Sequence, residues 1–350
     1  MASRRAFLRA AGGALVAFAA GRGTAQPARR KEVRVGGRRM LIVDVHAHCM
    51  FADAGRVPGI EMPRIAPATL TLGPERLQVM DERGIDVQAL SVNTYWWYSA
   101  DRAAAERVVA IHDEGIAAWC KQHPQRFVGL SSVALQFPEL AAEQLEHAVK
   151  RLGARGASIG GHVANEPPSS PKYDPFWAKA EELGVPVFMH PNNALNIARE
   201  GSLDGRGSLP NIVGNPLETT VFLSHMIYDG TLDRFPRLTL CAAHGGGYMP
   251  SYLGRADASC VVRPDASCAN KRKPSEYFKD QIVVDSMVFS AEGLRHLVAE
   301  TGASQVVYGS DIPYLWPDTI DVIAAAPFLT PAEKEAILGG NLKRLLKLEA

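Results

Sequence analysis

The chain contains the stretch Val43-Asp44-Val45-His46-Ala47-His48, in which apolar residues lead into a His-x-His pair. Short Val-rich runs of this kind are typical of a buried strand, and strand side chains alternate between the two faces. The two histidines therefore point to the same side at the strand end. Paired imidazoles of this kind suit a divalent transition metal, although a single His-x-His pair is only a weak signal.

Other short apolar runs also end on a residue that can ligate a metal or transfer a proton. They are Val187–His190, Leu240–His244 and Tyr308–Asp311, with Gly161-His162 as a weaker fifth example. Singly, each ending has an ordinary alternative, such as a hydrogen-bonded core or turn histidine or a helix-capping aspartate. Together they predict one site, because a barrel of parallel strands gathers distant strand ends at one mouth.

Eight apolar runs alternate with helical patterns along the chain, which predicts an α/β fold of the (β/α)8, or TIM-barrel, type. The predicted strands are Leu41–His48, Val87–Asn93, Phe127–Val133, Ala157–Val163, Val185–His190, Leu238–His244, Ile282–Asp285 and Val306–Asp311. We expect one barrel domain over residues 26–350. A last helix is expected to open at Thr330-Pro331 and to break at Gly339-Gly340-Asn341.

The strand ends predict a metal centre of the kind that Zn²⁺ prefers, with imidazole and carboxylate ligands. We expect His46, His48, His190 and Asp311 to bind the ion. The fourth strand has no lysine that could be carbamylated to bridge two metals, so one ion is expected. His244 is the expected acid/base residue, acting with a metal-bound water, and Asp311 would ligate the ion, hold that water or do both.

The composition excludes some function classes. In 350 residues, 38 lysines and arginines face 37 aspartates and glutamates, so the net charge of +1 gives no electrostatic case for nucleic acid or an anionic membrane surface. The five cysteines cannot all be paired. Cys260 and Cys268 could pair in an oxidising compartment, whereas Cys241 is expected to face outward because its strand parity is opposite to that of His244.

Residues 1–25 resemble a secretory leader. Ser3-Arg4-Arg5-Ala6-Phe7-Leu8-Arg9 is close to the twin-arginine export signature and precedes a weakly apolar stretch and a small-residue cleavage site. An amphipathic anchor is the alternative, but the stretch is short and Gly-rich for a membrane span. No other segment reaches membrane-spanning length. We therefore expect twin-arginine export and a periplasmic enzyme.

Some aromatic and histidine residues have two possible roles. Tyr95-Trp96-Trp97-Tyr98 could wall an aromatic substrate pocket or could pack against the loop after the first strand. His162 could touch a substrate or could be structural. His112 lies in a helical pattern and is expected at the surface.

The chain resembles the amidohydrolase superfamily, in particular its branch typified by aminocarboxymuconate-semialdehyde decarboxylase. The resemblance extends over nearly all of residues 41–348. Its most specific motifs are Glu218-Thr219-Thr220, Phe235-Pro236-Arg237-Leu238, Ala243-His244-Gly245-Gly246-Gly247, Leu253-Gly254-Arg255, Lys273-Pro274-Ser275-Glu276-Tyr277, Val284-Asp285-Ser286 and Gly309-Ser310-Asp311-Ile312-Pro313.

This resemblance implies zinc bound by His46, His48, His190 and Asp311, with His244 as the acid/base histidine. It also implies a homodimer, in which Arg255 reaches a substrate carboxylate across the subunit interface while Arg64 binds carboxylate oxygens beside it. The chain departs from the pattern after His190, where Pro191-Asn192-Asn193 replaces an aromatic-acidic pair, and just before Arg64, where a basic cluster is missing. The substrate of that family enzyme is therefore not assigned to this chain.

We expect a carboxy-lyase that removes CO2 from a small unsaturated or aromatic carboxylic acid. The same ligands and base would also serve a metal-dependent hydrolase of a lactone, ester or amide. A non-catalytic binding protein is the third alternative, which the complete set of ligands and His244 argues against.

Overall fold

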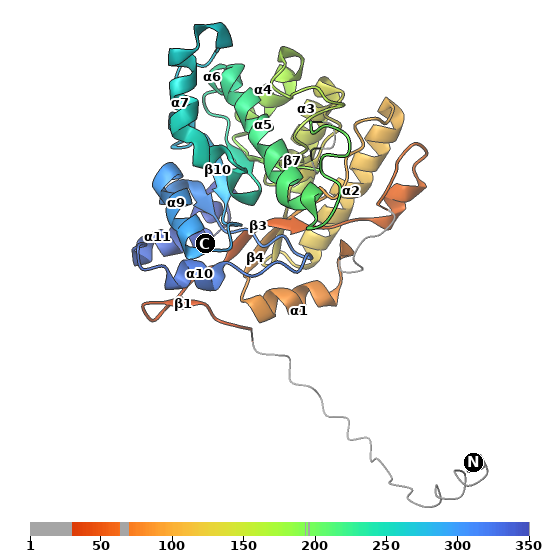
Figure 1. Ribbon diagram of the computed structural model, residues 1–350. Coiled ribbons are helices and arrows are strands. Elements are labelled where there is room, and N and C mark those ends of the chain that lie inside the picture. Colours follow the sequence, from red (N-terminus) through yellow and green to blue (C-terminus); the bar gives the residue numbers. More distant parts are fainter. Residues whose placement is uncertain (1–29, 64–69, 193, 195–196, 350) are drawn as a thin grey trace, which may run out of the picture.

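The computed structural model describes residues 30–63, 70–192, 194 and 197–349. Within these residues the core is a set of parallel strands with helices around it (Figure 1). Every strand pairing in the core is parallel, in the orders β3-β4-β5 and β6-β7-β8-β9-β10-β11. The strands are β3 (Val43–His48), β4 (Val87–Ser91), β5 (Phe127–Gly129), β6 (Ser131–Ser132), β7 (Ala157–Ile159), β8 (Val187–Met189), β9 (Leu240–Ala242), β10 (Ile282–Asp285) and β11 (Val306–Val307).

Two junctions join these sets into one closed barrel. Only Leu130 separates β5 from β6, and its N–H donates to the carbonyl of Leu90 at 2.9 Å. At the other junction the Val45 N–H donates to the carbonyl of Tyr308 at 3.1 Å, and Ala47 forms a parallel bridge with Ile312. Counting β5 and β6 as one strand, the described residues form the predicted (β/α)8 barrel.

The helices lie on the outside of the barrel. The longer ones are α1 (Pro74–Arg83), α2 (Arg102–Gln122), α3 (Pro138–His147), α4 (Asp174–Leu183), α5 (Asn215–Tyr228), α7 (Leu253–Val262) and α9 (Ala291–Thr301). Shorter ones are α6 (Thr231–Arg234), α8 (Pro274–Tyr277), α10 (Ile320–Ala325), α11 (Pro331–Glu335) and α12 (Asn341–Leu345). A small antiparallel hairpin of β1 (Arg34–Val35) and β2 (Arg38–Arg39) precedes the barrel.

The barrel interior is a separate apolar cluster to which almost every strand contributes. Its members are Val43, Val45, Ala89, Leu130, Phe188, Cys241, Ala243, Val283 and Val307, with Leu342 and Leu346 from the C-terminal helix. Cys241 therefore faces inward, and the outward orientation predicted for it is wrong. The prediction took strand parity from His244, but His244 has a φ of 56° and has already left the strand.

The predicted break at Gly339-Gly340-Asn341 is also wrong. A wide helical turn, η10 (Ala336–Gly340), connects α11 to α12, and Glu335 and Asn341 at its two ends have right-handed helical backbone. A Cβ on Gly339 would lie 2.2 Å from the carbonyl oxygen of Leu41. The glycine thus serves close packing of this helix against the start of β3, which no local sequence rule reveals.

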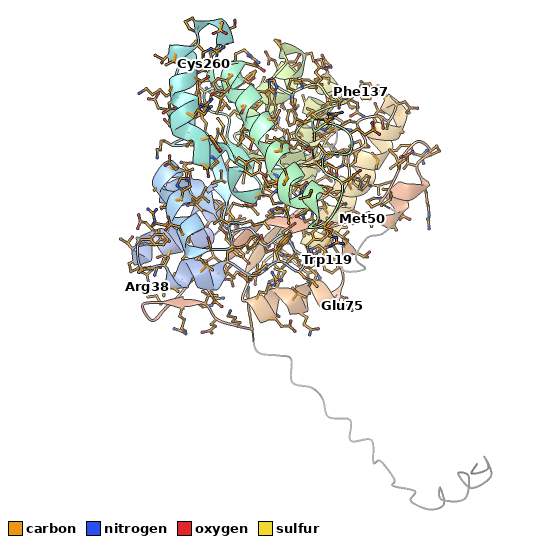
Figure 2. All side chains as sticks on the ribbon, in the orientation of Figure 1. Arg38, Met50, Glu75, Trp119, Phe137 and Cys260 are labelled. Atoms are coloured by element: carbon orange, nitrogen blue, oxygen red, sulfur yellow. A yellow bond between two sulfur atoms is a disulfide. The ribbon has the colours of Figure 1, made fainter. Side chains whose placement is uncertain are left out.

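Cys260 and Cys268 form a disulfide, and the remaining three cysteines are free. Cys260 lies at the outer end of α7 (Figure 2). Among the helices that the structure describes, none combines the length and the apolar character needed to cross a bilayer.

Candidate metal centre

The first strand brings two histidines to the carboxyl-terminal end of the barrel. The register of β3 against β4 shifts between Asp44 and Ala47, as at a β-bulge or a similar irregularity. Val45 packs in the interior cluster, whereas the rings of His46 and His48 lie at the barrel mouth with centroids 5.1 Å apart. Bulges often re-aim side chains beside active sites in this way.

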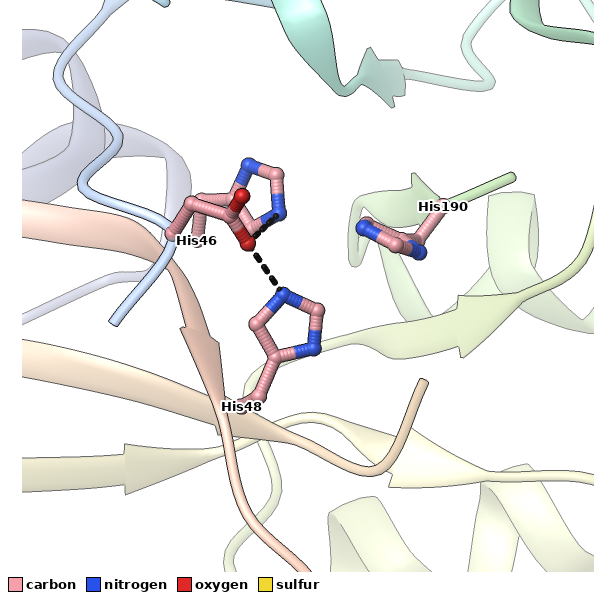
Figure 3. A group of neighbouring side chains, drawn as sticks. His46, His48 and His190 are labelled. Atoms are coloured by element: carbon pink, nitrogen blue, oxygen red, sulfur yellow. Dashed lines mark hydrogen bonds and ion pairs between the residues drawn. The ribbon is translucent and has the colours of Figure 1, made fainter. Parts of the chain in front are cut away.

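His190 directly follows β8, and Asp311 lies four residues beyond the end of β11. Together with His46 and His48 they form a buried group whose potential ligand atoms all lie within 4.8 Å of one another. Asp311 Oδ1 lies 2.6 Å from His48 Nε2 and 3.2 Å from His46 Nε2. His190 faces this pair of histidines from the opposite side (Figure 3). The four residues predicted as ligands therefore converge.

The charges in this group are strongly coupled. Burial opposes protonation of His46, but the carboxylates of Asp311 and Asp285 outweigh it and raise the His46 pKa to about 10. Burial also opposes ionisation of Asp311, yet His46 and His48 hold its pKa well below the usual range. Burial and the neighbouring His48 and His46 lower the pKa of His190 well below its ordinary value.

The group fits a divalent cation. The buried atoms His46 Nε2 and His190 Nδ1 have no hydrogen-bond partner among the described residues. Buried polar nitrogens are costly unless a ligand or water meets them. Three imidazoles with one carboxylate suit a transition metal such as zinc better than calcium or magnesium, which prefer oxygen. A metal site is therefore supported at this position.

His244 lies beside this group, in the turn that follows β9. Its ring centroid is 5.2 Å from that of His46 and 5.3 Å from that of His190. Burial, together with the neighbouring His46, lowers the His244 pKa to about 4. Gly247 in the same turn has a φ of 65°, and a Cβ there would lie 2.3 Å from the carbonyl oxygen of Pro216. The glycine run thus lets the turn pack tightly under α5.

Sequence reasoning gave no role to Asp285, the last residue of β10. The Asp285 carboxylate is fully buried and lies 2.8 Å from His46 Nδ1. The same carboxylate accepts hydrogen bonds from the N–H groups of His244 and Gly245 at 3.0 and 2.8 Å. Two signals could have found it, namely its place at the end of a predicted strand and its position in the Val284-Asp285-Ser286 motif.

A second buried network of hydrogen bonds surrounds β3, the strand that carries His46 and His48. Asp44 accepts hydrogen bonds from Gln88 Nε2 at 2.8 Å and from the hydroxyl of Ser310 at 2.6 Å. Arg76 of α1, only 3% exposed, donates to the carbonyl of His48 at 2.6 Å. Burial raises the pKa of the Asp44 carboxyl to about 6. These contacts fix the backbone of β3 just below the histidines.

A cavity of about 560 Å³ opens directly over the metal centre. Neutral polar and apolar side chains from the loops after β4, β8 and β11 form most of its wall. Its lining residues are His48, Asn93, Thr94, His190, Pro191, Asn192, Ser208, Pro210, Asn211, Ile212, Asn215, His244, Asp311, Tyr314, Leu315 and Trp316. This volume is in the range of small-molecule sites.

Of the two arginines predicted to bind substrate, the structure describes only Arg255. Arg64 lies outside the described residues, as does the leader at 1–25. Arg255 is exposed on α7 and is absent from the cavity wall. His162 is also absent from the wall, and its Nδ1 accepts from the Asn165 N–H at 3.3 Å.

The aromatic run after β4 packs instead of lining the cavity. Tyr95, Trp97 and Tyr98 are each at most 9% exposed. The Tyr95 hydroxyl lies 2.8 Å from Nε2 of His112, which is fully buried. The surface position predicted for His112 is therefore wrong, because the aromatic run covers that face of α2. The run therefore packs instead of lining the cavity, and Tyr95 and Trp97 contact His112 of α2.

A parallel barrel with three histidines and one aspartate at its carboxyl-terminal mouth defines a metal-dependent barrel enzyme. Residues 43–348 match the family model described as amidohydrolase. The chain belongs to this family, and the predicted resemblance is confirmed.

Several relatives of the chain are decarboxylases. The 2-amino-3-carboxymuconate-6-semialdehyde decarboxylase of Dictyostelium discoideum is 32% identical over 278 residues, which cover 78% of this chain and 76% of that protein. The gamma-resorcylate decarboxylase of Polaromonas sp. is 29% identical over 314 residues, covering 85% and 94% of the two chains.

Solved structures agree with this grouping. The 5-carboxyvanillate decarboxylase of Sphingomonas paucimobilis has a TM-score of 0.81 at 25% identity and covers 89% of this chain and all of its own. A dihydroxybenzoic acid decarboxylase of Polaromonas, crystallised with manganese and the inhibitor 2-nitroresorcinol, has a TM-score of 0.76 at 26% identity. The alignment covers 89% of this chain and 98% of that enzyme.

Proposed function

We propose that this chain is a metal-dependent carboxy-lyase that removes CO2 from a small aromatic or unsaturated carboxylic acid. The observation that carries the proposal is the buried group of three histidines and one aspartate beneath a cavity of about 560 Å³. The decarboxylases among the relatives support this reaction class. We propose one zinc ion per chain, with manganese as the alternative because a related crystal structure contains it.

The residues divide the chemistry between them. His46, His48, His190 and Asp311 would hold the cation, which would polarise a substrate oxygen and stabilise negative charge there. His244 lies beside these ligands and would pass a proton taken from water to the substrate carbon, with Asp311 assisting its transfer. As the bond to the carboxyl carbon breaks, its electron pair stays on the substrate carbon and CO2 leaves. The incoming proton takes the vacated position.

Arg64 and Arg255 are proposed to bind carboxylate oxygens, in a bidentate manner where geometry allows. Because Arg255 is exposed and does not line its own chain's cavity, it would have to act in a neighbouring subunit. The proposal therefore includes a homodimer.

A substrate screen tests the reaction class. Purified protein loaded with zinc or manganese would be offered 2,6-dihydroxybenzoate, 5-carboxyvanillate, and neutral lactones, esters and amides. We expect CO2 release from an acid, its loss with a chelator and its return with metal. Turnover of a neutral lactone, ester or amide, without CO2 release from any acid, would instead establish the hydrolase alternative.

We also propose that residues 1–25 direct twin-arginine export to the periplasm, on the basis of Arg4 and Arg5 within the leader. Mass spectrometry of the periplasmic fraction should find the chain without its leader. The double substitution Arg4→Lys and Arg5→Lys should leave it in the cytoplasm, and unchanged export of that variant would refute this route.

A further inference from the structure

Asp285 connects the metal centre to the proposed acid/base residue. The Asp285 side chain is fully buried at the end of β10, outside the group of potential ligands. Its Oδ2 lies 2.8 Å from His46 Nδ1 and accepts the His244 N–H at 3.0 Å. Its Oδ1 accepts the N–H groups of Gly245 and Met287 at 2.8 and 3.1 Å. Each oxygen therefore already has two protein donors, and the carboxylate is held in place.

The contact with His46 decides which ring nitrogen faces the cation. A carboxylate oxygen accepts a hydrogen, so in the neutral ring that binds a cation Nδ1 of His46 carries the hydrogen and Nε2 offers its lone pair. That Nε2 points toward Asp311, at 3.2 Å from Oδ1, and has no other partner among the described residues. Asp285 thus presents His46 to the site in its ligating form.

The contacts with the turn decide where the His244 ring lies. His244 has a φ of 56°, a conformation that costs energy for any residue with a Cβ. Two successive N–H groups, of His244 and Gly245, converge on the one carboxylate. Without that acceptor both would be buried donors with no partner there, and the turn would relax toward extended backbone. The His244 ring would then move away from His46.

We propose that Asp285 is a positioning residue that sets the ligating form of His46 and the place of His244 at the same time. The inference deepens the proposed function and depends on it only for the role of His244. Its effect on cation binding does not depend on which substrate the enzyme uses.

The test compares Asp285→Asn with Asp113→Asn. An asparagine has a single acceptor oxygen, so it cannot serve His46, His244, Gly245 and Met287 together. Asp113 is an equally suitable control because it is buried and accepts from Ser131 and Ser132, remote from the cavity wall. We expect zinc and manganese affinity, measured by chelator competition, to fall about 10- to 100-fold in Asp285→Asn. The affinity of Asp113→Asn should stay at the wild-type value.

Two further readouts separate the parts of the inference. At saturating metal, kcat of Asp285→Asn should remain below that of the wild type, because the His244 turn is released, whereas KM should change less. Asp285→Glu keeps the charge but displaces it by one methylene, so its kcat and its cation affinity should lie between those of the wild type and of Asp285→Asn. This variant also replaces Asp285→Asn in the test if the asparagine variant does not fold. Wild-type cation affinity in either folded variant, or an equal loss in Asp113→Asn, would overturn the inference. Absence of decarboxylation in all proteins, with the affinity difference intact, would count against the proposed function alone.

Discussion

At the scale of single residues, the site depends on the direction in which each strand-end side chain points. His46 and His48 share one face of β3, and His190 and Asp311 reach the same point from β8 and β11. These four could be predicted because strand ends in a parallel barrel meet at one mouth. Asp285 was not assigned a role, because two of its partners are backbone N–H groups of a turn that packs against it only in the folded chain.

The role of His244 can be separated from metal binding. His244→Asn removes the proton donor but no ligand, so the bound cation should be retained. We expect kcat for CO2 release to fall about 100- to 10,000-fold, the usual contribution of a positioned acid/base group. His225→Asn is the matched control, since His225 is exposed on α5 and contacts Asp229. Loss of the metal from His244→Asn would show instead that this residue is a ligand.

Asp113 gives a prediction on stability against pH. Burial raises its pKa from 3.8 to about 7 in the folded chain. Between these values the folded form binds more protons than the unfolded form, so stability falls as the pH rises toward 7 and then levels off. Asp113→Asn should abolish this contribution to the pH dependence of stability. The slope that is lost is at most about 1.4 kcal/mol per pH unit.

Chemical denaturation of the wild type and of Asp113→Asn from pH 4 to pH 7 checks the sign. As the pH rises, the free energy of unfolding of Asp113→Asn should increase relative to that of the wild type. A parallel pH dependence in the two proteins would show that Asp113 is ionised throughout the folded state.

At the scale of elements, alternation of apolar runs with helical stripes was sufficient to predict the strands. The errors arose where packing between distant elements decides the local structure. Gly339 looked like a helix breaker, but it lies inside a continuous helical segment that touches Leu41. His112 looked like a surface residue of α2 until the run after β4 covered it.

Gly339→Ala should therefore destabilise the fold. The new Cβ would lie 2.2 Å from a backbone oxygen of Leu41, which cannot move aside without shifting β3. Overpacking of this kind costs about 1–3 kcal/mol, which thermal or denaturant unfolding can measure. Gly254→Ala in α7 is the comparison, because no atom lies within 4 Å of its added Cβ. Equal stability of the two variants would contradict the packing argument.

At the scale of the whole molecule, the barrel separates stability from chemistry. Leu342 and Leu346 of the C-terminal helix join the apolar interior, while the metal centre lies at the carboxyl-terminal ends of the strands. A single chain contains the whole barrel and all four potential ligands. The proposed carboxylate-binding site would need a second chain, because Arg255 is exposed on α7.

Subunit complementation tests this proposed sharing. Arg255→Ala and His190→Ala should each be nearly inactive alone, the first through a raised KM and the second through loss of the cation. In mixed dimers, the Arg255→Ala chain keeps its metal and would receive Arg255 from the His190→Ala chain. Activity should therefore reappear after subunit exchange. No recovery, despite mixed dimers verified by mass spectrometry, would show that Arg255 does not act across the interface.

The central claim is that His46, His48, His190 and Asp311 together hold a single cation. Metal content per chain, measured after loading with zinc or manganese and desalting, tests it most directly. We predict one ion per wild-type chain and essentially none in His190→Ala, whose apo form should remain folded by circular dichroism. A wild-type chain that retains no ion, or a His190→Ala chain that retains a full equivalent, would contradict the account.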